Sequence, residues 1–597
     1  MSVIFEGLVR KYGYWAVAAS QRVVSDSLLP TVGDSLHVWR LSTSQSFRPD
    51  PASGLSQTLK DGFKQYSFLF HAGHERDTTL TAGYSATPRN CIAELGEASM
   101  TSTPVRLTAA PLRTQDIAAI ARRHSLVEVS PEADALIRAS RAVIERHAAE
   151  NRPVYGLTTA LGAAVDTPLS GEDLIAYQRR VSFGHAVGFG EALPREAVRA
   201  MMAVRIAGMA AGGTGISPAV FEGLVAALNA GLHPVVPSLG SLGAADLAPL
   251  AHMTLGLLGH GQAEYGGETM PAAEALERAG LKPLDIHAKD GHAIIVANSL
   301  SVAQACLALE DIERAFEWSL RAVALNLEAF RANVSSLDDS AMAARPAFGQ
   351  RAVAARLREL LSGSTLFKEG AARRIQDPLS YRCVPQVWGA LRHAIDEARA
   401  ATEIELASSG DNPVVLAGED RIVSHGNFDM TAFVLSWERL SQALAHAAAG
   451  IANRTIKLMS PAVAGLPRFL AANGQNRMGF AILQKPVSAM EAEIRFLASP
   501  ISLTPIAVSD WVEDQSSMAP AVIAKVNQIV ERFRYLVAME LISAAYAAEI
   551  RGVADRLGRG ADEAYRTVRE RVAPLEEDRE LGCDVASIAA MIAQSCS

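Results

Sequence analysis

Residues 302–330, VAQACLALEDIERAFEWSLRAVALNLEAF, contain the apolar pattern that decides the fold class. Apolar side chains recur at steps of three and four, at Val302, Cys306, Leu309, Ile312, Phe316, Leu320, Val323, Leu327 and Phe330. These steps place them on one face of a long α-helix. Similar patterns run through 431–451, 486–499 and 519–556. The sequence therefore predicts a mainly α-helical protein built on a long antiparallel bundle, with some helices buried between subunits.

The composition is that of an ordered globular protein. Hydrophobic residues make up 49% of the 597 residues and charged residues 20%. The net charge of −8 gives no reason to expect nucleic acid as a partner. The five cysteines are scattered without a pairing pattern, and no secretion signal is apparent, which indicates the cytoplasm. We expect no membrane span, because no uninterrupted apolar run reaches about 18 residues.

Residues 1–103 differ from the rest of the chain. They contain eleven aromatic residues, show no sustained helical period and are interrupted by Ser, Thr, Gly and Pro clusters. They are either an accessory domain or upstream sequence added by a misplaced start, with Met100 as the alternative first residue. We expect residues 1–99 to be dispensable. The predicted domains are this extension, an N-terminal region with active-site loops at 104–300, and the bundle with C-terminal helices at 301–597.

A second informative stretch is 240–252, GSLGAADLAPLAH. It resembles the signature of the histidine and aromatic amino acid ammonia-lyases, which reads Gly-Ala-Ser-Gly-Asp. In that family Ala-Ser-Gly cyclises into methylidene-imidazolone (MIO), an electrophile made from the chain itself. Here the equivalent residues, Gly243-Ala244-Ala245-Asp246, are one residue short and lack the serine. We therefore expect no external cofactor and no MIO. The sequence also lacks an HExxH motif and a Cys/His cluster at zinc spacing, so we expect no metal.

Further motifs of the same family follow in the family's order. They are Tyr155–Gly162, Gln178 with Gly184-His185, Gln376–Gln386, Ser408–Pro413, Gly426-Asn427-Phe428, Gly465-Leu466-Pro467 and Glu513-Asp514. The resemblance implies the helical bundle of the histidine and phenylalanine ammonia-lyases. It also implies a homotetramer whose active sites draw on several subunits, acting on a small amino acid or betaine. The activity implied is a carbon–nitrogen elimination that yields an α,β-unsaturated acid.

The residue types suit that chemistry. The planar guanidinium of Arg382 can bind a substrate carboxylate bidentately. Tyr155 can remove the Cβ proton if nearby charges lower its pKa from about 10. Glu513 is a catalytic candidate that can contact a ring N–H or the amine, and His185 can hydrogen-bond an imidazole-type ring. The plainer alternatives are a structural ion pair, a packed tyrosine, a surface glutamate and a core histidine. The resemblance adds four substrate-binding candidates: Gln376, Asn412, Phe428 and Asn298.

The departures from the family add aromatic surface and negative charge. Trp388 and Asp429 stand where the family often has histidine, Leu379 stands where it usually has tyrosine, and Asp510-Trp511 precede Glu513. Indole faces and carboxylates attract quaternary ammonium. We therefore predict that a site for a cationic group draws on Trp388, Trp511, Asp429 and Asp510.

Loss of the electrophile favours a particular substrate class. MIO accepts the lone pair of a substrate amine, and a quaternary ammonium has no lone pair to give. The chain thus resembles the MIO-less ergothionase branch of the family, which converts ergothioneine to thiourocanate and trimethylamine. Two alternatives remain open. One is an MIO-dependent histidine or aromatic amino acid ammonia-lyase in which Ala244-Ala245 is a recording artefact. The other is a catalytically inactive structural or regulatory paralogue.

Overall fold

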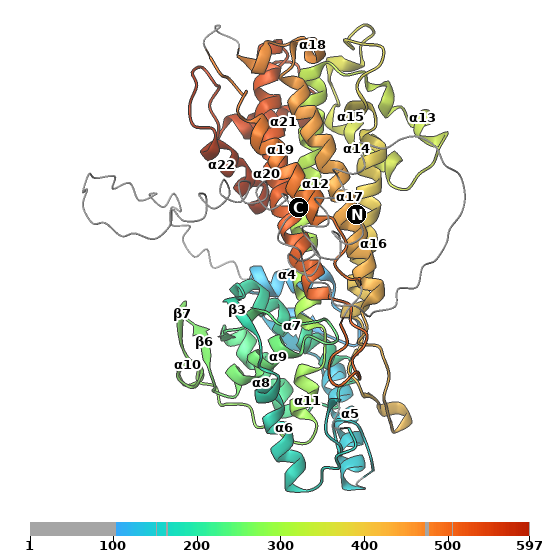
Figure 1. The fold of residues 1–597 in the computed structure, drawn as a ribbon, viewed down its shortest axis with the longest axis vertical. Coiled ribbons are helices and arrows are strands. Elements are labelled where there is room, and N and C mark those ends of the chain that lie inside the picture. Colours follow the sequence, from blue (N-terminus) through green and yellow to red (C-terminus); the bar gives the residue numbers. More distant parts are fainter. Residues whose placement is uncertain (1–102, 151, 163–164, 472–476, 504–505, 596–597) are drawn as a thin grey trace, which may run out of the picture. The chain divides into compact units, whose positions relative to one another are not determined.

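Helices make up most of the chain in the computed structural model (Figure 1). The structure describes residues 103–150, 152–162, 165–471, 477–503 and 506–595. The predictions for the extension 1–103 and for Met100 lie almost entirely outside these residues. From Ala98 onward the chain forms one unit, and the proposed boundary near residue 300 stays a prediction within it.

The first part of this unit combines short helices with small two- and three-stranded sheets. Its elements are β1 (Val105–Leu107), α4 (Thr114–Arg122), β2 (Val127–Val129), α5 (Pro131–Ala149), α6 (Glu172–His185), β3 (Phe189–Ala192), α7 (Arg195–Ala210), α8 (Pro218–Ala230), β4 (His233–Pro234), β5 (Pro237–Leu239), α9 (Leu247–Leu257), β6 (Gln262–Tyr265), β7 (Glu268–Pro271), α10 (Ala272–Arg278) and α11 (Asp290–Ile295). Strands β1 and β2 pair in parallel, whereas β3–β5 and β4–β6–β7 are antiparallel.

The second part contains the long helices. Its elements are α12 (Ser299–Phe330), η2 (Val334–Leu337), α13 (Asp339–Ala343), α14 (Gln350–Leu360), η3 (Thr365–Phe367), α15 (Leu379–Arg382), α16 (Val384–Leu406), β8 (Val414–Leu416), η4 (Ala417–Glu419), β9 (Arg421–Val423), α17 (Thr431–Leu458), α18 (Pro461–Ala464), η5 (Arg468–Leu470), α19 (Gln484–Leu497), α20 (Ala519–Arg551), α21 (Arg559–Arg569) and α22 (Gly582–Gln594). Strands β8 and β9 form an antiparallel hairpin.

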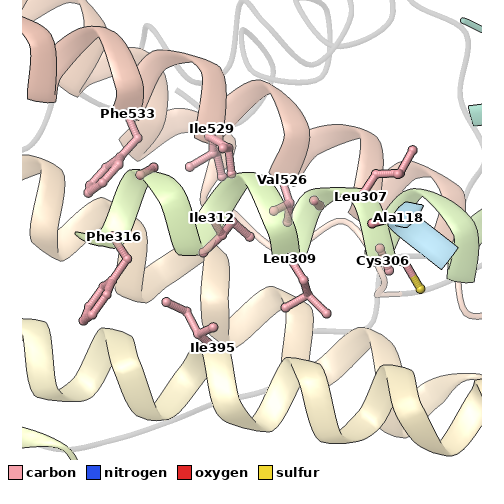
Figure 2. Close-up of a cluster of buried hydrophobic side chains, with 14 of the residues drawn as sticks. Ala118, Cys306, Leu307, Leu309, Ile312, Phe316, Ile395, Val526, Ile529 and Phe533 are labelled. Carbon is pink, nitrogen blue, oxygen red and sulfur yellow. The ribbon is translucent and has the colours of Figure 1, made fainter. Parts of the chain in front are cut away.

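Helix α12 lies at the centre of the bundle, between α20 and α16 (Figure 2). Its side chains Leu309, Ile312 and Phe316 belong to a cluster of buried apolar side chains. Ile395 of α16 and Phe533 of α20 are part of the same cluster. Helices α12, α17 and α20 run in one direction, because Asn298 at the start of α12 bonds to Phe428 before α17, and Arg551 at the end of α20 bonds to Ala329 near the end of α12. Helix α16 runs the opposite way, since its last turn lies beside Asp429, just before α17. The helical bundle that the apolar period predicted is confirmed, and the four predicted helices correspond to α12, α17, α19 and α20.

Within the described residues, one helical stretch, Asp290–Phe330, is long and apolar enough to pass a length-and-composition test for a membrane span. Its apolar window is 89% buried inside the unit, as expected for the core helix of a bundle. The helix ends at Phe330 because Arg331 adopts left-handed backbone angles with φ at 58°.

Candidate functional site

The loop equivalent to the family's MIO segment lies where three helices begin. Asp246 is the N-cap of α9, and its Oδ2 accepts a hydrogen bond from the backbone N–H of Ser301, in the first turn of α12, at 2.8 Å. Met518, directly before α20, donates its N–H to the carbonyl of Leu242 at 2.8 Å. Helix N-termini carry partial positive charge, so this place favours an anion or a developing negative charge.

The residues of this loop do not fit MIO. Ala244 and Ala245 have methyl side chains and offer no hydroxyl that dehydration could remove. The hydroxyl of Ser241 donates to Asp246 Oδ1 at 2.8 Å and accepts from the N–H of Gly243 at 3.2 Å. Ser241 is also followed by Leu242, not by the glycine that the family's cyclisation uses. No chemical step through MIO is therefore derived for this chain.

The loop is nevertheless held tightly. Gly243 has φ at +75°, and a Cβ atom there would lie 2.7 Å from Ser517 Oγ. Ser517 also donates its hydroxyl to the carbonyl of Gly243 at 3.0 Å. Ala245 has a left-handed φ of 62°, which costs an L-residue about 1–2 kcal/mol. The surrounding contacts impose this conformation, so the loop is an ordered part of the site.

Tyr155 lies in a turn between α5 and α6, close to Glu513. Its phenol oxygen accepts a hydrogen bond from the N–H of Gly162 at 3.0 Å, much as Tyr177 accepts one from Leu161 at 2.9 Å. Burial raises the pKa of Tyr155, and the charge of Glu513 raises it further, although the bond from Gly162 opposes this. The condition stated for a tyrosine base, a lowered pKa, is not met within a single chain. A cation from elsewhere would have to supply it.

His292 is a further candidate site residue, which the sequence interpretation missed. Its ring packs edge-to-face against Tyr155, with ring centroids 5.8 Å apart, and its buried Nδ1 has no hydrogen-bond partner among the described residues. Burial lowers the pKa of His292 far below its usual value, and the charges of Lys289 and His185 lower it further. The ring is thus neutral at physiological pH. It stands directly before the apolar run 293–297, and no motif at this position indicated a functional role from the sequence.

Gln178 connects the tyrosine loop to α11. Its Nε2 donates to the carbonyl of Gly156 at 2.9 Å, and its Oε1 accepts from the N–H of His292 at 2.9 Å. The side chain is 1% exposed. One buried amide therefore fixes both the loop that carries Tyr155 and the helix that carries His292.

His185 and Glu513 approach this region from two other elements. His185 is the last residue of α6, and its Nδ1 lies 2.8 Å from the carbonyl oxygen of Val181. Glu513 Oε1 accepts a hydrogen bond from Ser509 at 2.8 Å. The turn before Glu513 contains three consecutive left-handed residues, ending at Trp511, whose side chain is 80% exposed. Trp511 is therefore available to a ligand or to a second subunit.

Asn298 and Phe428 are in direct contact. Asn298 is the N-cap of α12, and its Nδ2 donates to the carbonyl of Phe428 at 2.7 Å, while its Oδ1 has no partner in the described part of the chain. Asn412 Oδ1 accepts from the N–H of His425 at 2.9 Å, and the exposed Asp429 accepts from the N–H of Thr431 at 3.0 Å. These four predicted residues therefore gather near the start of α12 and α17.

Glu405, at the end of α16, is a further carboxyl group beside Asp429. Burial raises the pKa of Glu405 to about 7, and repulsion from Asp429 contributes to the shift. The sequence interpretation did not single it out. With Asp429, it makes this end of the bundle rich in carboxyl groups.

Arg382 and Gln376 lie at the other end of α12. Asp377 Oδ2 accepts the N–H of Asn333 at 2.6 Å, three residues beyond the end of α12. The 32 residues of α12 span about 48 Å. The structure therefore does not bring Arg382 or Gln376 to Tyr155, His185 or Asn298 of the same chain. In Figure 1, α15, which carries Arg382, lies far from α6 and α11.

A buried network anchors the short helix that carries Arg382. Tyr381 donates its hydroxyl to Asn326 Oδ1 at 3.0 Å, and Arg454 Nη1 donates to the carbonyl of Ser380 at 3.1 Å. Arg454 also pairs bidentately with Glu540 at 2.7 and 2.9 Å, and both side chains are fully buried. Helix α15 is too short to be stable alone, so these bonds hold Arg382 in place. The Nε of Arg382 is buried without a partner in the described chain.

The placement of Trp388 corrects the sequence interpretation. We expected it in the cation site with Trp511, but it is 1% exposed inside the bundle. Its Nε1 donates to Ser319 Oγ at 2.8 Å, and its ring packs on the guanidinium of Arg454, 4.6 Å from the ring centroid. Trp388 faces the core because it shares a helical stripe with Val384 and with Leu391, Ile395 and Ala398, all buried.

Comparison with known proteins places the chain in a family. Residues 112–570 match the family model described as aromatic amino acid lyase. The chain belongs to this family. It is 38% identical over 484 residues to the histidine ammonia-lyase of Symbiobacterium thermophilum, covering 81% of this chain and 95% of that protein. It is also 38% identical over 483 residues to the histidine ammonia-lyase of Stigmatella aurantiaca, covering 81% and 94%. The protein is therefore a carbon–nitrogen lyase of the ammonia-lyase type.

Solved structures of the family have the same fold. Ergothionase from Treponema denticola, in complex with desmethyl-ergothioneine sulfonic acid, superposes with a TM-score of 0.79 at 31% identity, covering 82% of this chain and 98% of that one. Histidine ammonia-lyase from Trypanosoma cruzi superposes with a TM-score of 0.76 at 29% identity, covering 82% and 93%. The likeness thus includes both an ergothioneine-degrading enzyme and a histidine deaminase.

Proposed function

We propose that this lyase eliminates trimethylamine from an imidazole-type betaine without MIO, and that its substrate is ergothioneine. The observation that carries the proposal is the ordered loop Gly243–Asp246, which offers no hydroxyl for MIO formation at the place where the family forms it. The chain has Tyr155, His185, Glu513 and Arg382 at the positions that match the family's motifs, while its loop lacks the electrophile. This combination suits a substrate that does not need one.

The chemistry of the leaving group supports the same class. A quaternary ammonium has no lone pair to add to MIO, and it already leaves as a neutral tertiary amine. It needs instead an environment that attracts a cation. The exposed indole of Trp511 and the carboxylates of Asp429 and Asp510 suit that purpose, each aromatic contact being worth about 0.5–2 kcal/mol. Trp388 is buried inside the bundle and takes no part in this site.

The proposed active site needs more than one chain. Its carboxylate anchor, Arg382, lies a full helix length from Tyr155, so the anchor must come from a neighbouring copy. The end of α12 near Tyr155 carries Glu405, Asp429 and Glu513, whereas the end near Arg382 is rich in arginine. Opposite charges favour contact between unlike ends of two copies. We propose a homotetramer with composite sites, in the cytoplasm.

The proposed mechanism uses protein groups alone. Arg382 of the partner subunit binds the substrate carboxylate, while His185 and Glu513 hold the ring. The guanidinium also supplies the positive charge that lowers the pKa of Tyr155 in the assembled site. Tyr155 then removes the Cβ proton. The electron pair of that C–H bond forms the Cα–Cβ double bond as the Cα–N bond breaks, and trimethylamine leaves with the electrons of that bond.

Histidine is the second candidate substrate, because the two relatives compared above at 38% identity are histidine ammonia-lyases. That reaction would lack the family's electrophile in this chain. The mass of the intact purified protein separates the two cases. MIO formation releases two molecules of water, so a protein with MIO would be lighter than its sequence by that mass. We expect the full sequence mass, and a deficit of two waters would favour histidine deamination.

A further inference from the structure

The end of α12 near Arg382 contains a cavity that the lyase reaction does not use. Its volume is about 440 Å³, and it lies between the end of α12, the segment Thr365–Ala371 and the turn that follows α20. Its charged lining residues are Arg331, Lys368, Arg551, Arg556, Glu328 and Glu369. A volume of this size falls in the range of small-molecule sites.

The two carboxyl groups do not balance the four cations. Glu328 is 2% exposed, and its Oε1 accepts the N–H of Gly558 at 2.9 Å. Burial raises the pKa of Glu328, although bonds from Ser364 and Gly558 oppose this. Glu369 is exposed, and within the described residues neither carboxyl group forms an ion pair. The lining therefore has an excess of positive charge.

The three arginines of the lining are bonded to backbone carbonyls instead of carboxylates. Arg551 donates to the carbonyls of Ala329 at 3.1 Å and Ala464 at 2.5 Å. Arg331 donates its Nε to Ala371 at 3.0 Å, and Arg556 donates to Gly552 at 2.6 Å. Across the part of the chain that is described, none of the lining cations has a carboxylate at ion-pair distance. A guanidinium has five N–H donors, so Arg331 and Arg556 retain several for a ligand.

Neighbouring arginines add to the unbalanced charge. Burial lowers the pKa of Arg551, and repulsion from Arg373 and Arg331 lowers it further. Burial also lowers the pKa of Arg373, and repulsion from Arg374 lowers it further. The buried Nε of Arg373 has no hydrogen-bond partner in the described chain. Partly buried cations without a carboxylate partner lower the stability of the fold, and a bound anion would offset this loss of free energy.

We infer that this cavity binds a small multivalent oxyanion, either a phosphate or a polycarboxylate, through the free donors of Arg331, Lys368 and Arg556. Guanidinium groups bind such oxyanions bidentately, and a lysine adds a point charge. The inference does not depend on the identity of the lyase substrate, because it concerns residues outside the proposed reaction.

Titration of the full-length protein with inorganic phosphate and, separately, with citrate tests this. Ionic strength is held constant with sodium chloride, and binding is followed by calorimetry and by the thermal midpoint. We expect saturable binding of at least one anion, and the stronger of the two identifies the ligand class. Lys368→Gln and Arg556→Gln should each weaken binding about tenfold, the scale of one charge-assisted hydrogen bond.

Lys282→Gln is the matched control, because Lys282 is also exposed and forms no ion pair among the described residues, but it lies in the loop after α10. It should leave both titrations unchanged. Arg382→Lys should also leave them unchanged. The inference is overturned if neither anion binds saturably, if Lys282→Gln weakens binding as much as Lys368→Gln, or if Arg382→Lys alone abolishes it. Since Lys368 and Arg556 are exposed, unaltered circular dichroism is expected for both variants.

Discussion

At its N-terminal end α12 meets a tightly packed loop, neutral His292 and several carboxyl groups, whereas at its C-terminal end it meets arginines bonded to carbonyls. The first end holds Asp246, Glu405, Asp429 and Glu513, and the second holds Arg382 with the cationic cavity around Arg331. Both arrangements agree with the helix dipole, which favours anions at a helix N-terminus and cations at its C-terminus. Neither end of one chain therefore offers both a group for a carboxylate and a group for a cation, and the site proposed above combines the two ends from different copies.

The largest expected effect concerns the proposed base, Tyr155, at the N-terminal end of α12. Tyr155→Phe should lower kcat by about 10²–10⁴-fold, as for the loss of a general base, with a much smaller change in KM. Steady-state kinetics with ergothioneine measure this. Tyr177→Phe is a matched control, because Tyr177, on α6, accepts a backbone hydrogen bond from the same loop as Tyr155 does. Equal losses in both variants would show that Tyr155 supports the loop and does not act as the base.

A second expected effect concerns the anchoring network at the C-terminal end. Arg454→Met should lower the free energy of unfolding by about 3–5 kcal/mol, because it leaves Glu540 buried without its partner. Chemical denaturation at a fixed protein concentration measures this. Replacing both residues by methionine should recover much of the loss. If the single variant were as stable as the original protein, the buried pair would not hold α15.

The anchor itself should have an intermediate effect. Arg382→Lys keeps the charge but loses the planar fork, so kcat/KM should fall by an amount corresponding to about 1.5–3 kcal/mol, expressed mainly in KM. Arg374→Lys is the control, since Arg374 is exposed and donates to the carbonyl of Ala462. An unchanged KM in Arg382→Lys would remove Arg382 from the substrate site.

The smallest effect is a pH dependence at the carboxyl-rich end. The pKa of Glu405 rises from 4.5 to about 7 on folding, so its contribution to stability is complete below pH 4.5 and is lost as the pH rises through 7. Glu405→Gln should flatten this fall and add about 1–3 kcal/mol at pH 8, after allowance for solvent screening. Asp429→Asn should narrow the pH range over which stability falls, because it removes the repulsion that helps to raise the pKa of Glu405. A pH profile unaffected by either change would contradict this account of Glu405.

The fold was predictable because the apolar period is long and regular, as in Leu309, Ile312 and Phe316. Trp388 was misplaced because its indole was interpreted as a ligand contact, although its spacing from Val384 and Leu391 predicts a core position. His292 gave no signal, since a lone histidine at the start of an apolar run is usually packed. The separation of Arg382 from Tyr155 arises from a helix that the sequence did predict, so it could have been inferred from the length of that helix.

The rate at which the purified protein forms an ultraviolet-absorbing acid and trimethylamine from ergothioneine, before and after borohydride treatment, tests the central claim most directly. Borohydride attacks MIO and has no corresponding target in the loop Gly243–Asp246. The account predicts turnover of ergothioneine that borohydride does not change, with little or no reaction of histidine. Rapid deamination of histidine that borohydride abolishes, with no trimethylamine from ergothioneine, would contradict it.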